Sequence, residues 1–165
     1  MSVAVARVRT APLADVPVDF RWDRDTGILA ARIAHPVPAS APSAQFALAG
    51  RDGAWVTLEL AGDRLTGVDV VVWPAVRVVP TLVAPVVEPV TLSWRRLAAA
   101  GAVRALATPL AAEVAPDRGL VRLRVAGRRV TRTVREARDV CIDLDHTGSF
   151  AGVWLLNVPP CPEGS

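Results

Sequence analysis

The sequence contains no lysine and no tyrosine, and its 165 residues include only two histidines and two cysteines. So few histidines leave little material for a nucleophile–base–acid triad or a histidine-rich metal site. The cysteines, Cys141 and Cys161, lack the C-x-x-C spacing of zinc and redox motifs. We therefore expect no metal and no cofactor, and we expect a reducing, cytoplasmic setting.

Long uninterrupted apolar runs are also missing. The longest apolar segment, residues 68–87, is broken by Asp69, Arg77 and three prolines, so it does not predict a transmembrane helix. Residues 1–12 carry Arg7 and Arg9 within an alternating pattern, which is unlike a signal peptide. We also find no G-x-S-x-G, phosphate-binding glycine loop or dinucleotide fingerprint. These absences leave an enzyme open and favour a non-enzymatic protein.

All 19 basic side chains are arginine, and the net charge is only +3. Arginine, alanine, valine, proline and glycine have GC-rich codons, so this composition indicates a high-GC bacterium before it indicates a nucleic-acid partner. The charge is nevertheless uneven, because residues 118–138 contain eight arginines and one acid, Glu136. Hydrophobic residues make up 52% and charged residues 21%, which excludes a disordered chain and a disulfide scaffold.

The dominant sequence period is two, which predicts strands with one buried face. It is clearest in residues 3–9, 55–60 and 120–125. Short connectors that contain glycine, at 61–64 and 126–129, predict hairpins. One short helix is predicted at residues 94–100, with Ser93 as its N-cap and Gly101 as its end.

Four blocks of the sequence recur in the same order, which predicts an internal duplication. The matched pairs of blocks are 12–16 with 109–114, 25–33 with 117–125, 56–60 with 140–144, and 65–74 with 150–159. We therefore divide a single domain, 1–165, into copy one (3–74), a connector (75–101), copy two (102–159) and a mobile tail (160–165). The predicted fold is mainly β, with two related β-meander halves packed as a sandwich or partly closed barrel and the short helix in the connector.

Each copy resembles the DUF2283 type, a small family of β-rich bacterial proteins. Trp22, Asp23, Asp25 and Gly27 resemble the aromatic-aspartate start of that family, and residues 140–156 resemble its acid-flanked strand, glycine turn and aliphatic close. The resemblance spans about three quarters of the chain. It implies a fold and no particular activity.

The arginine-rich segment is a candidate partner-binding site. Arg122 and Arg124 share one face of a predicted strand, and Arg129 and Arg132 follow the predicted turn. A hairpin across Arg118–Arg138 could bind an acidic protein partner or phosphates. The alternative is a solvated face that protects a sheet edge. No aromatic residue is interleaved for base stacking, so a nucleic-acid partner is disfavoured.

A second candidate is apolar. Trp73, Trp154 and Leu156 lie in the matched closing strands, where they fill the core or a subunit interface, or line a pocket for an apolar ligand. In the last candidate, Cys141, Asp143 and Asp145 alternate along one strand face with His146 beyond. For residues 145–148 we favour an ordinary turn, capped by Asp145 and closed by Gly148, over a metal site.

These features lead to three functional hypotheses. The first is a non-enzymatic binding or assembly module that self-associates as a homo-oligomer or binds a protein partner. The alternative is a small apolar-ligand-binding or cyclase-like β-barrel protein of secondary metabolism. The second alternative is a nucleic-acid-associated regulator that uses the 118–138 hairpin. None of the three involves a membrane.

Overall fold

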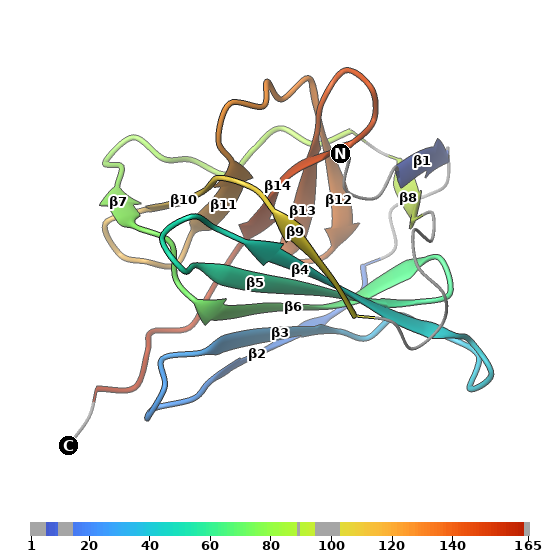
Figure 1. The fold of residues 1–165 in the computed structure, drawn as a ribbon, viewed down its shortest axis with the longest axis horizontal. Coiled ribbons are helices and arrows are strands. Elements are labelled where there is room, and N and C mark those ends of the chain that lie inside the picture. The colour runs from blue at the N-terminus through green and yellow to red at the C-terminus, as the bar shows by residue number, and fades with distance from the viewer. Residues whose placement is uncertain (1–5, 10–14, 89, 95–102, 164–165) are drawn as a thin grey trace.

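The computed structural model describes residues 6–9, 15–88, 90–94 and 103–163. This part of the chain contains fourteen strands and no helix. The first sheet crosses the lower half of Figure 1 and has the order β2-β3-β6-β5-β4-β9. Its strands are β2 (Val18–Trp22), β3 (Leu29–Ile33), β4 (Ser43–Ala49), β5 (Trp55–Ala61), β6 (Arg64–Val72) and β9 (Val103–Ala107).

The second sheet lies above the first in Figure 1 and has the order β12-β13-β14-β11-β10-β7. Its strands are β7 (Val76–Val78), β10 (Leu110–Val114), β11 (Val121–Val125), β12 (Arg132–Ala137), β13 (Val140–Leu144) and β14 (Phe150–Leu155). A separate antiparallel pair joins β1 (Ala6–Arg9) to β8 (Thr91–Trp94). The predicted mainly β fold is confirmed, and the arrangement is not a closed barrel.

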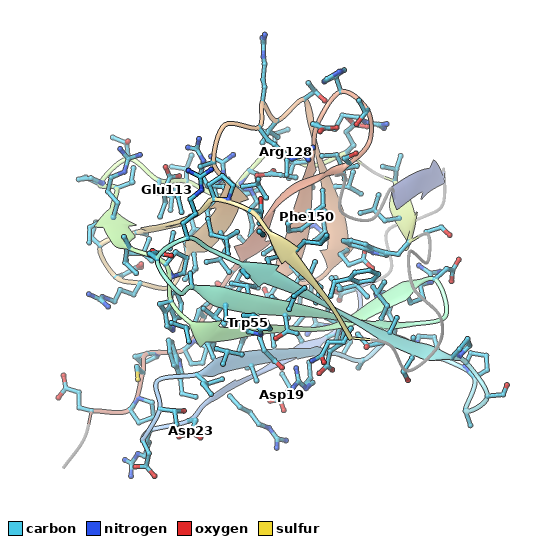
Figure 2. The ribbon with its side chains drawn as sticks, viewed as in Figure 1. Asp19, Asp23, Trp55, Glu113, Arg128 and Phe150 are labelled. Carbon is cyan, nitrogen blue, oxygen red and sulfur yellow. The ribbon has the colours of Figure 1, made fainter. Side chains whose placement is uncertain are left out.

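Both large sheets contribute to one hydrophobic core. Along β11 the valines and Leu123 are buried while Arg122 and Arg124 lie on the other face, as alternation predicts. Phe46 of the first sheet and Phe150 of the second both belong to the same core cluster. Figure 2 shows Phe150 in the middle of the molecule, whereas Arg128 lies in a loop far from the first sheet.

The two halves have the same strand order. Copy one is arranged as β2-β3-β6-β5-β4 and copy two as β10-β11-β14-β13-β12. In each half the first two strands form a hairpin, and the chain then crosses to the far edge of the sheet. The next three strands lie side by side in order, and the last of them pairs with the second strand of the hairpin. This order is a Greek key, so the predicted simple meander is wrong. Alternation identifies the buried face of a strand, but it does not identify the neighbouring strand.

Of the two connectors predicted to form hairpins, only one joins neighbouring strands, because alternation does not identify strand partners. Ala61 pairs with Arg64, and Gly62 between them has a φ of 61°, so the hairpin at 61–64 is confirmed. The hairpin at 126–129 is wrong, because β11 and β12 lie in one sheet with β14 and β13 between them. Residues 126–131 instead form the crossing connection of the Greek key.

Residues matched in the sequence repeat occupy matching positions in the two sheets. Arg32 and Glu59 are both partners of Gly67, just as Arg124 and Asp143 are both partners of Gly152. The register also shifts directly after Glu59 in copy one and directly after Asp143 in copy two. This agreement of topology and register supports the duplication that the sequence predicts.

Two strands connect the halves by pairing with the other sheet. After β6 the chain leaves the first sheet, and β7 pairs in parallel with β10 of the second sheet. Conversely, β9 pairs in parallel with β4 of the first sheet before the chain enters β10. Because β7 follows β6 and pairs with β10, the end of β6 lies close to the start of the second half.

The helix predicted at 94–100 does not begin at Trp94, because this residue belongs to a strand. Trp94 ends strand β8, where it pairs with Ala6, and its buried ring lies 6.3 Å from that of Phe150 between centroids. Strand pairing and ring burial therefore override the local helix propensity of this residue. The remaining residues of the predicted helix lie outside the described part of the chain.

The matched glycines predict an asymmetry between the two halves. A Cβ atom on Gly152 would lie 2.7 Å from the Leu123 carbonyl oxygen, whereas on Gly67 it would first meet the Arg32 guanidinium at 2.8 Å. Because a side chain can move aside and a central strand cannot, Gly152→Ala should lower the free energy of unfolding by about 2–3 kcal/mol and Gly67→Ala by less than about 1 kcal/mol. Urea unfolding measures both changes. Equal losses would contradict this difference between the halves.

Candidate functional site

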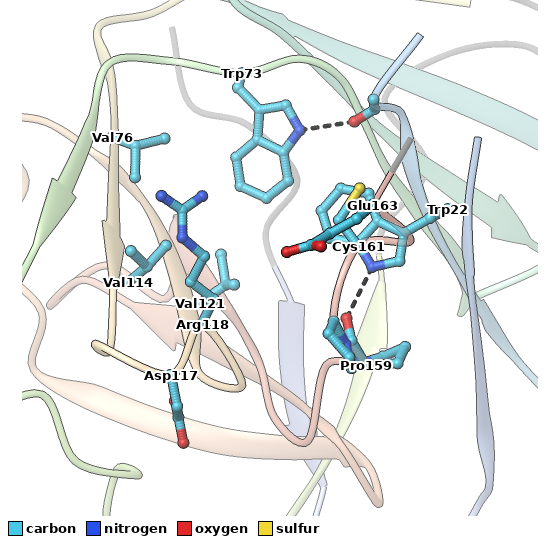
Figure 3. A pocket seen from close by; sticks show the side chains of 12 residues that line it. Trp22, Trp73, Val76, Val114, Asp117, Arg118, Val121, Pro159, Cys161 and Glu163 are labelled. Atoms are coloured by element: carbon cyan, nitrogen blue, oxygen red, sulfur yellow. Dashed lines mark hydrogen bonds between the residues drawn. The ribbon is translucent and has the colours of Figure 1, made fainter. Parts of the chain in front are cut away.

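A cavity of about 470 Å³ opens where β6 leads into β7. Its lining comes from both halves of the chain and from the C-terminal segment (Figure 3). The lining residues are Trp22, Gly27, Trp73, Val76, Val114, Asp117, Arg118, Val121, Pro159, Pro160, Cys161 and Glu163. The β2–β3 turn and the β10–β11 turn, which are matched in the sequence repeat, both contribute to it.

Two stacked indole rings form one wall of the cavity. The centroids of Trp22 and Trp73 lie 5.9 Å apart, and the ring planes differ by 14°. Trp22 Nε1 donates to the Pro159 carbonyl oxygen at 2.8 Å, and Trp73 Nε1 donates to the Gly27 carbonyl oxygen at 3.0 Å. Both indole N–H groups are therefore engaged by the protein, which leaves the ring carbons as an apolar surface.

Charged side chains also line the cavity. Arg118 extends toward Trp73, whereas the carboxylate of Asp117 points away (Figure 3). The Asp117 carboxylate instead accepts a hydrogen bond from the Gly119 backbone N–H at 3.0 Å. Glu163, from the segment after β14, directs its carboxylate toward the space beside the two rings.

The predicted arginine site is built differently from the predicted hairpin. Arg122 donates to Asp143 Oδ2 from Nε at 3.2 Å and from Nη2 at 3.1 Å, and its guanidinium lies 4.8 Å from the centroid of the Trp154 ring. Trp154 Nε1 and Thr133 Oγ1 also donate to Asp143, at 3.0 Å and 2.6 Å. The side chain of Asp143 is only 1% exposed, so these donors neutralise and solvate a buried carboxylate.

The other predicted arginines are dispersed. Arg124 pairs with Glu113 at 3.3 Å, and Arg132 binds both carboxylate oxygens of Glu88. Arg129 is exposed in the 126–131 loop. Arg122 Nη1 also lies 3.7 Å from Glu113 Oε2, so Arg122 and Arg124 share this acid. The four arginines thus belong to three separate surroundings, and their role toward a partner stays a prediction.

Residues 79–88, which we call the strap, link β7 at one edge of the second sheet to β12 at the other. Leu82 and Val87 of the strap pack against the small cluster of Cys141, Trp154 and Leu156 on the outer face of the sheet. Glu88 forms an isolated parallel bridge with Val134 of β12. The strap thereby buries the outer face of β13 and β14.

Of the predicted apolar site, Trp73 lines the cavity, whereas Trp154 and Leu156 lie beneath the strap. The sequence analysis did not place Trp22 in a site, and it included Arg118 only as the first residue of the candidate arginine hairpin. A signal was present, since Trp22 directly precedes one matched turn and Arg118 lies within the other. Their meeting depends on how the halves pack, which the repeat alone does not specify.

The sequence matches no protein-family model. No curated protein is similar to it either. Within the part of the chain that the structure describes, no helix is long and apolar enough to span a membrane, and no three histidine, cysteine or acidic side chains converge as metal ligands. The cavity geometry therefore carries the functional argument.

One buried pair of titratable groups joins the halves away from the cavity. His35 Nε2, in the loop after β3, lies 3.3 Å from Glu136 Oε1 on β12, and their side chains are 5% and 2% exposed. The carboxylate of Glu136 accepts no hydrogen bond from the described residues. Its only acid–base partner in this part of the structure is His35.

The turn predicted at 145–148 is confirmed. The Gly148 N–H donates to the Asp145 carbonyl oxygen at 3.0 Å, and Gly148 has a φ of 77°. The Asp145 carboxylate accepts from the backbone N–H groups of Thr147 and Ser149, at 2.9 Å and 3.0 Å, and from Arg128 at 2.6 Å. This carboxylate is used to hold the turn.

Asp145 predicts a specific acid sensitivity. Burial raises the pKa of this carboxyl, but hydrogen bonds from Thr147, Ser149 and Arg128 outweigh burial and lower the pKa from 3.8 to about 2. The stabilisation is therefore complete above about pH 4 and is lost as the pH falls toward 2. Urea unfolding between pH 5 and pH 2 should show a steeper loss of stability for the wild type than for Asp145→Asn, which keeps an oxygen acceptor for the turn. Parallel pH profiles would contradict this assignment.

Proposed function

We propose that this protein is a non-enzymatic binding module whose cavity takes one small, apolar, ring-containing molecule. The observation that carries the proposal is the wall formed by Trp22 and Trp73. Its indole N–H groups are already bonded within the protein, so the remaining ring surface favours an apolar partner. The volume, about 470 Å³, falls within the range of ordinary small-molecule sites.

Other lining residues support binding over catalysis. Val76, Val114 and Val121 extend the apolar surface, and neither histidine of the chain lines the cavity. Cys161 lines it, but its Sγ donates only to the Pro162 carbonyl oxygen, at 3.9 Å, and no basic partner among the described residues activates it as a nucleophile. A shaped apolar site with few acid–base groups fits a carrier or sensor of a small molecule.

Titration with N-phenyl-1-naphthylamine, a neutral aromatic probe whose fluorescence rises in apolar surroundings, tests this function. We expect saturable binding of one probe per chain. Val76→Trp should weaken it by about ten-fold or more, since Val76 lines the cavity and a larger ring would fill it.

The matched control is Val78→Trp, on the same strand and similarly exposed but outside the cavity. It should leave the affinity for the probe unchanged. Absence of saturable binding, or equal affinities in the two variants, would overturn the proposal.

Self-association is a second candidate, favoured by a different observation. In the described part of the chain, the exposed large hydrophobic residues all fall within residues 72–86; they are Val72, Val76, Val78, Val83 and Val86. Two of them, Val76 and Val78, lie on β7, an edge strand of the second sheet that is able to pair with a second copy.

Sedimentation velocity tests self-association. A dimer formed through β7 should dissociate in Val78→Arg and persist in Ser40→Arg, a change in an exposed loop of copy one. A monomeric wild type at high micromolar concentration would rule this candidate out. The ligand-binding proposal does not depend on the result.

A further inference from the structure

We propose that the ligand of this cavity is a planar aromatic molecule that carries an anionic group, with its rings against Trp22 and Trp73 and its anion bound by Arg118. This inference rests on the proposed function and specifies the chemistry of the ligand. It begins from the position of Arg118, whose side chain extends into the cavity toward the Trp73 ring (Figure 3).

The backbone of Arg118 is in an unfavourable conformation. Its φ is 59°, a left-handed value that costs free energy for a residue with a Cβ atom. In copy one the matched turn places its positive φ, 71°, at Gly27. In copy two the glycine follows at position 119, yet the arginine takes the left-handed conformation. Strain of this kind is concentrated at functional sites.

Local hydrogen bonds hold Arg118 in that conformation. Its N–H donates to the Ala115 carbonyl oxygen at 2.8 Å, and the next N–H, of Gly119, donates to Asp117 Oδ1 at 3.0 Å. The turn is thus fixed at both sides of the arginine. The side chain is presented to the cavity by a rigid backbone, which lowers the entropic cost of binding.

Arg118 also lacks the ion pairs that most arginines of its segment form. Within 118–138, several other arginines form ion pairs with acids of the same chain; these are Arg122, Arg124, Arg128, Arg132 and Arg138. Arg118 forms no ion pair with any residue that the structure describes. Its nearest acid in sequence, Asp117, is turned away from the cavity.

An arginine in these surroundings suits a carboxylate, a sulfonate or another anion that turns two oxygens toward the guanidinium. The guanidinium presents parallel N–H donors that match two anionic oxygens. Glu163 reaches the same cavity from the C-terminal segment and disfavours a second negative charge near the rings. The geometry therefore favours one anionic group located on the Arg118 side.

Two probes with the same rings separate the charge from the ring system. 8-Anilino-1-naphthalenesulfonate is N-phenyl-1-naphthylamine with an added sulfonate. We expect the wild type to bind the sulfonate probe about ten-fold more tightly than the neutral probe. Raising the salt concentration should reduce this preference.

Variants of Arg118 and Glu163 identify the source of the preference for the sulfonate probe. Arg118→Gln should remove the preference, because it should weaken binding of the sulfonate probe far more than binding of the neutral probe. Arg118→Gly should do the same with a midpoint of urea unfolding at or above that of the wild type, because glycine adopts the left-handed conformation without strain. Glu163→Gln should strengthen binding of the sulfonate probe. Arg129→Gln, an exposed arginine of the same basic segment, should change neither affinity.

The outcomes separate the two proposals. If neither probe binds saturably to the wild type, the proposed function itself fails. If the neutral probe binds and the sulfonate probe binds no more tightly, or if Arg118→Gln weakens both equally, the anionic ligand is excluded while the ligand site stands.

Discussion

Replacing Asp143 with alanine is expected to lower the free energy of unfolding by about 3–5 kcal/mol, because the change removes the acceptor of three largely buried donors and leaves Arg122 only its longer contact with Glu113, at 3.7 Å. The carboxylate is 1% exposed and accepts hydrogen bonds from Arg122, Thr133 and Trp154. All three donors would lose their acceptor together. Urea unfolding monitored by tryptophan fluorescence measures the loss.

The internal repeat supplies the control for this substitution. Glu59 occupies the matching register position in copy one, beside Gly67, but it is 36% exposed and lies 4.0 Å from Arg32. Because an exposed ion pair contributes little, Glu59→Ala should cost less than about 1 kcal/mol. Similar losses for the two substitutions would show that burial does not set the contribution of this position.

Replacing His35 with leucine should cost about 3–5 kcal/mol, because Glu136 would be left as a buried carboxylate with no partner among the described residues. Replacing both residues with leucine removes the buried charge together with its partner. We expect the double variant to recover most of the stability, to within about 1 kcal/mol of the wild type.

A double-mutant cycle by urea unfolding measures the coupling between the two residues. The cycle also tests how the halves are joined, because His35 lies in the loop after β3 of copy one and Glu136 lies on β12 of copy two. Additive effects of the two single substitutions would mean that the residues do not interact, and would contradict this contact.

Strand positions and faces were largely predictable from the sequence, because burial of one strand face imposes alternation on its residues. Residues 121–125 show this directly, since their apolar members face the core and Arg122 and Arg124 face away. The repeat carried further information. The alignment of Gly67 with Gly152 and of Glu59 with Asp143 corresponds to matching register positions in the two sheets.

Strand partners were not predictable in the same way. A strand in a hairpin and a strand in a Greek key have the same alternation, so the connectors at 61–64 and 126–129 appeared alike although only the first joins paired strands. The acidic partners of the arginines were hidden for a related reason. Arg132 and Glu88 are 44 residues apart and meet only because the strap crosses the second sheet.

The cavity was the least predictable feature. Trp73 was recognised as a candidate, but Trp22 and Arg118 join it only through the pairing of β7 with β10 and the course of the segment after β14. Trp154 appeared equivalent to Trp73 in the sequence. Its indole N–H donates to Asp143 beneath the strap, which removes it from the cavity.

The most direct test of the central claim is to record the indole N–H resonances of the five tryptophans by two-dimensional ¹H–¹⁵N NMR while N-phenyl-1-naphthylamine is added. Trp22→Phe and Trp73→Phe assign the two resonances that matter. If the probe enters the cavity, these two should shift in a saturable manner, while the resonance of Trp154 beneath the strap stays in place. Unchanged resonances, or shifts that spare Trp22 and Trp73, would contradict a ligand site between the two halves.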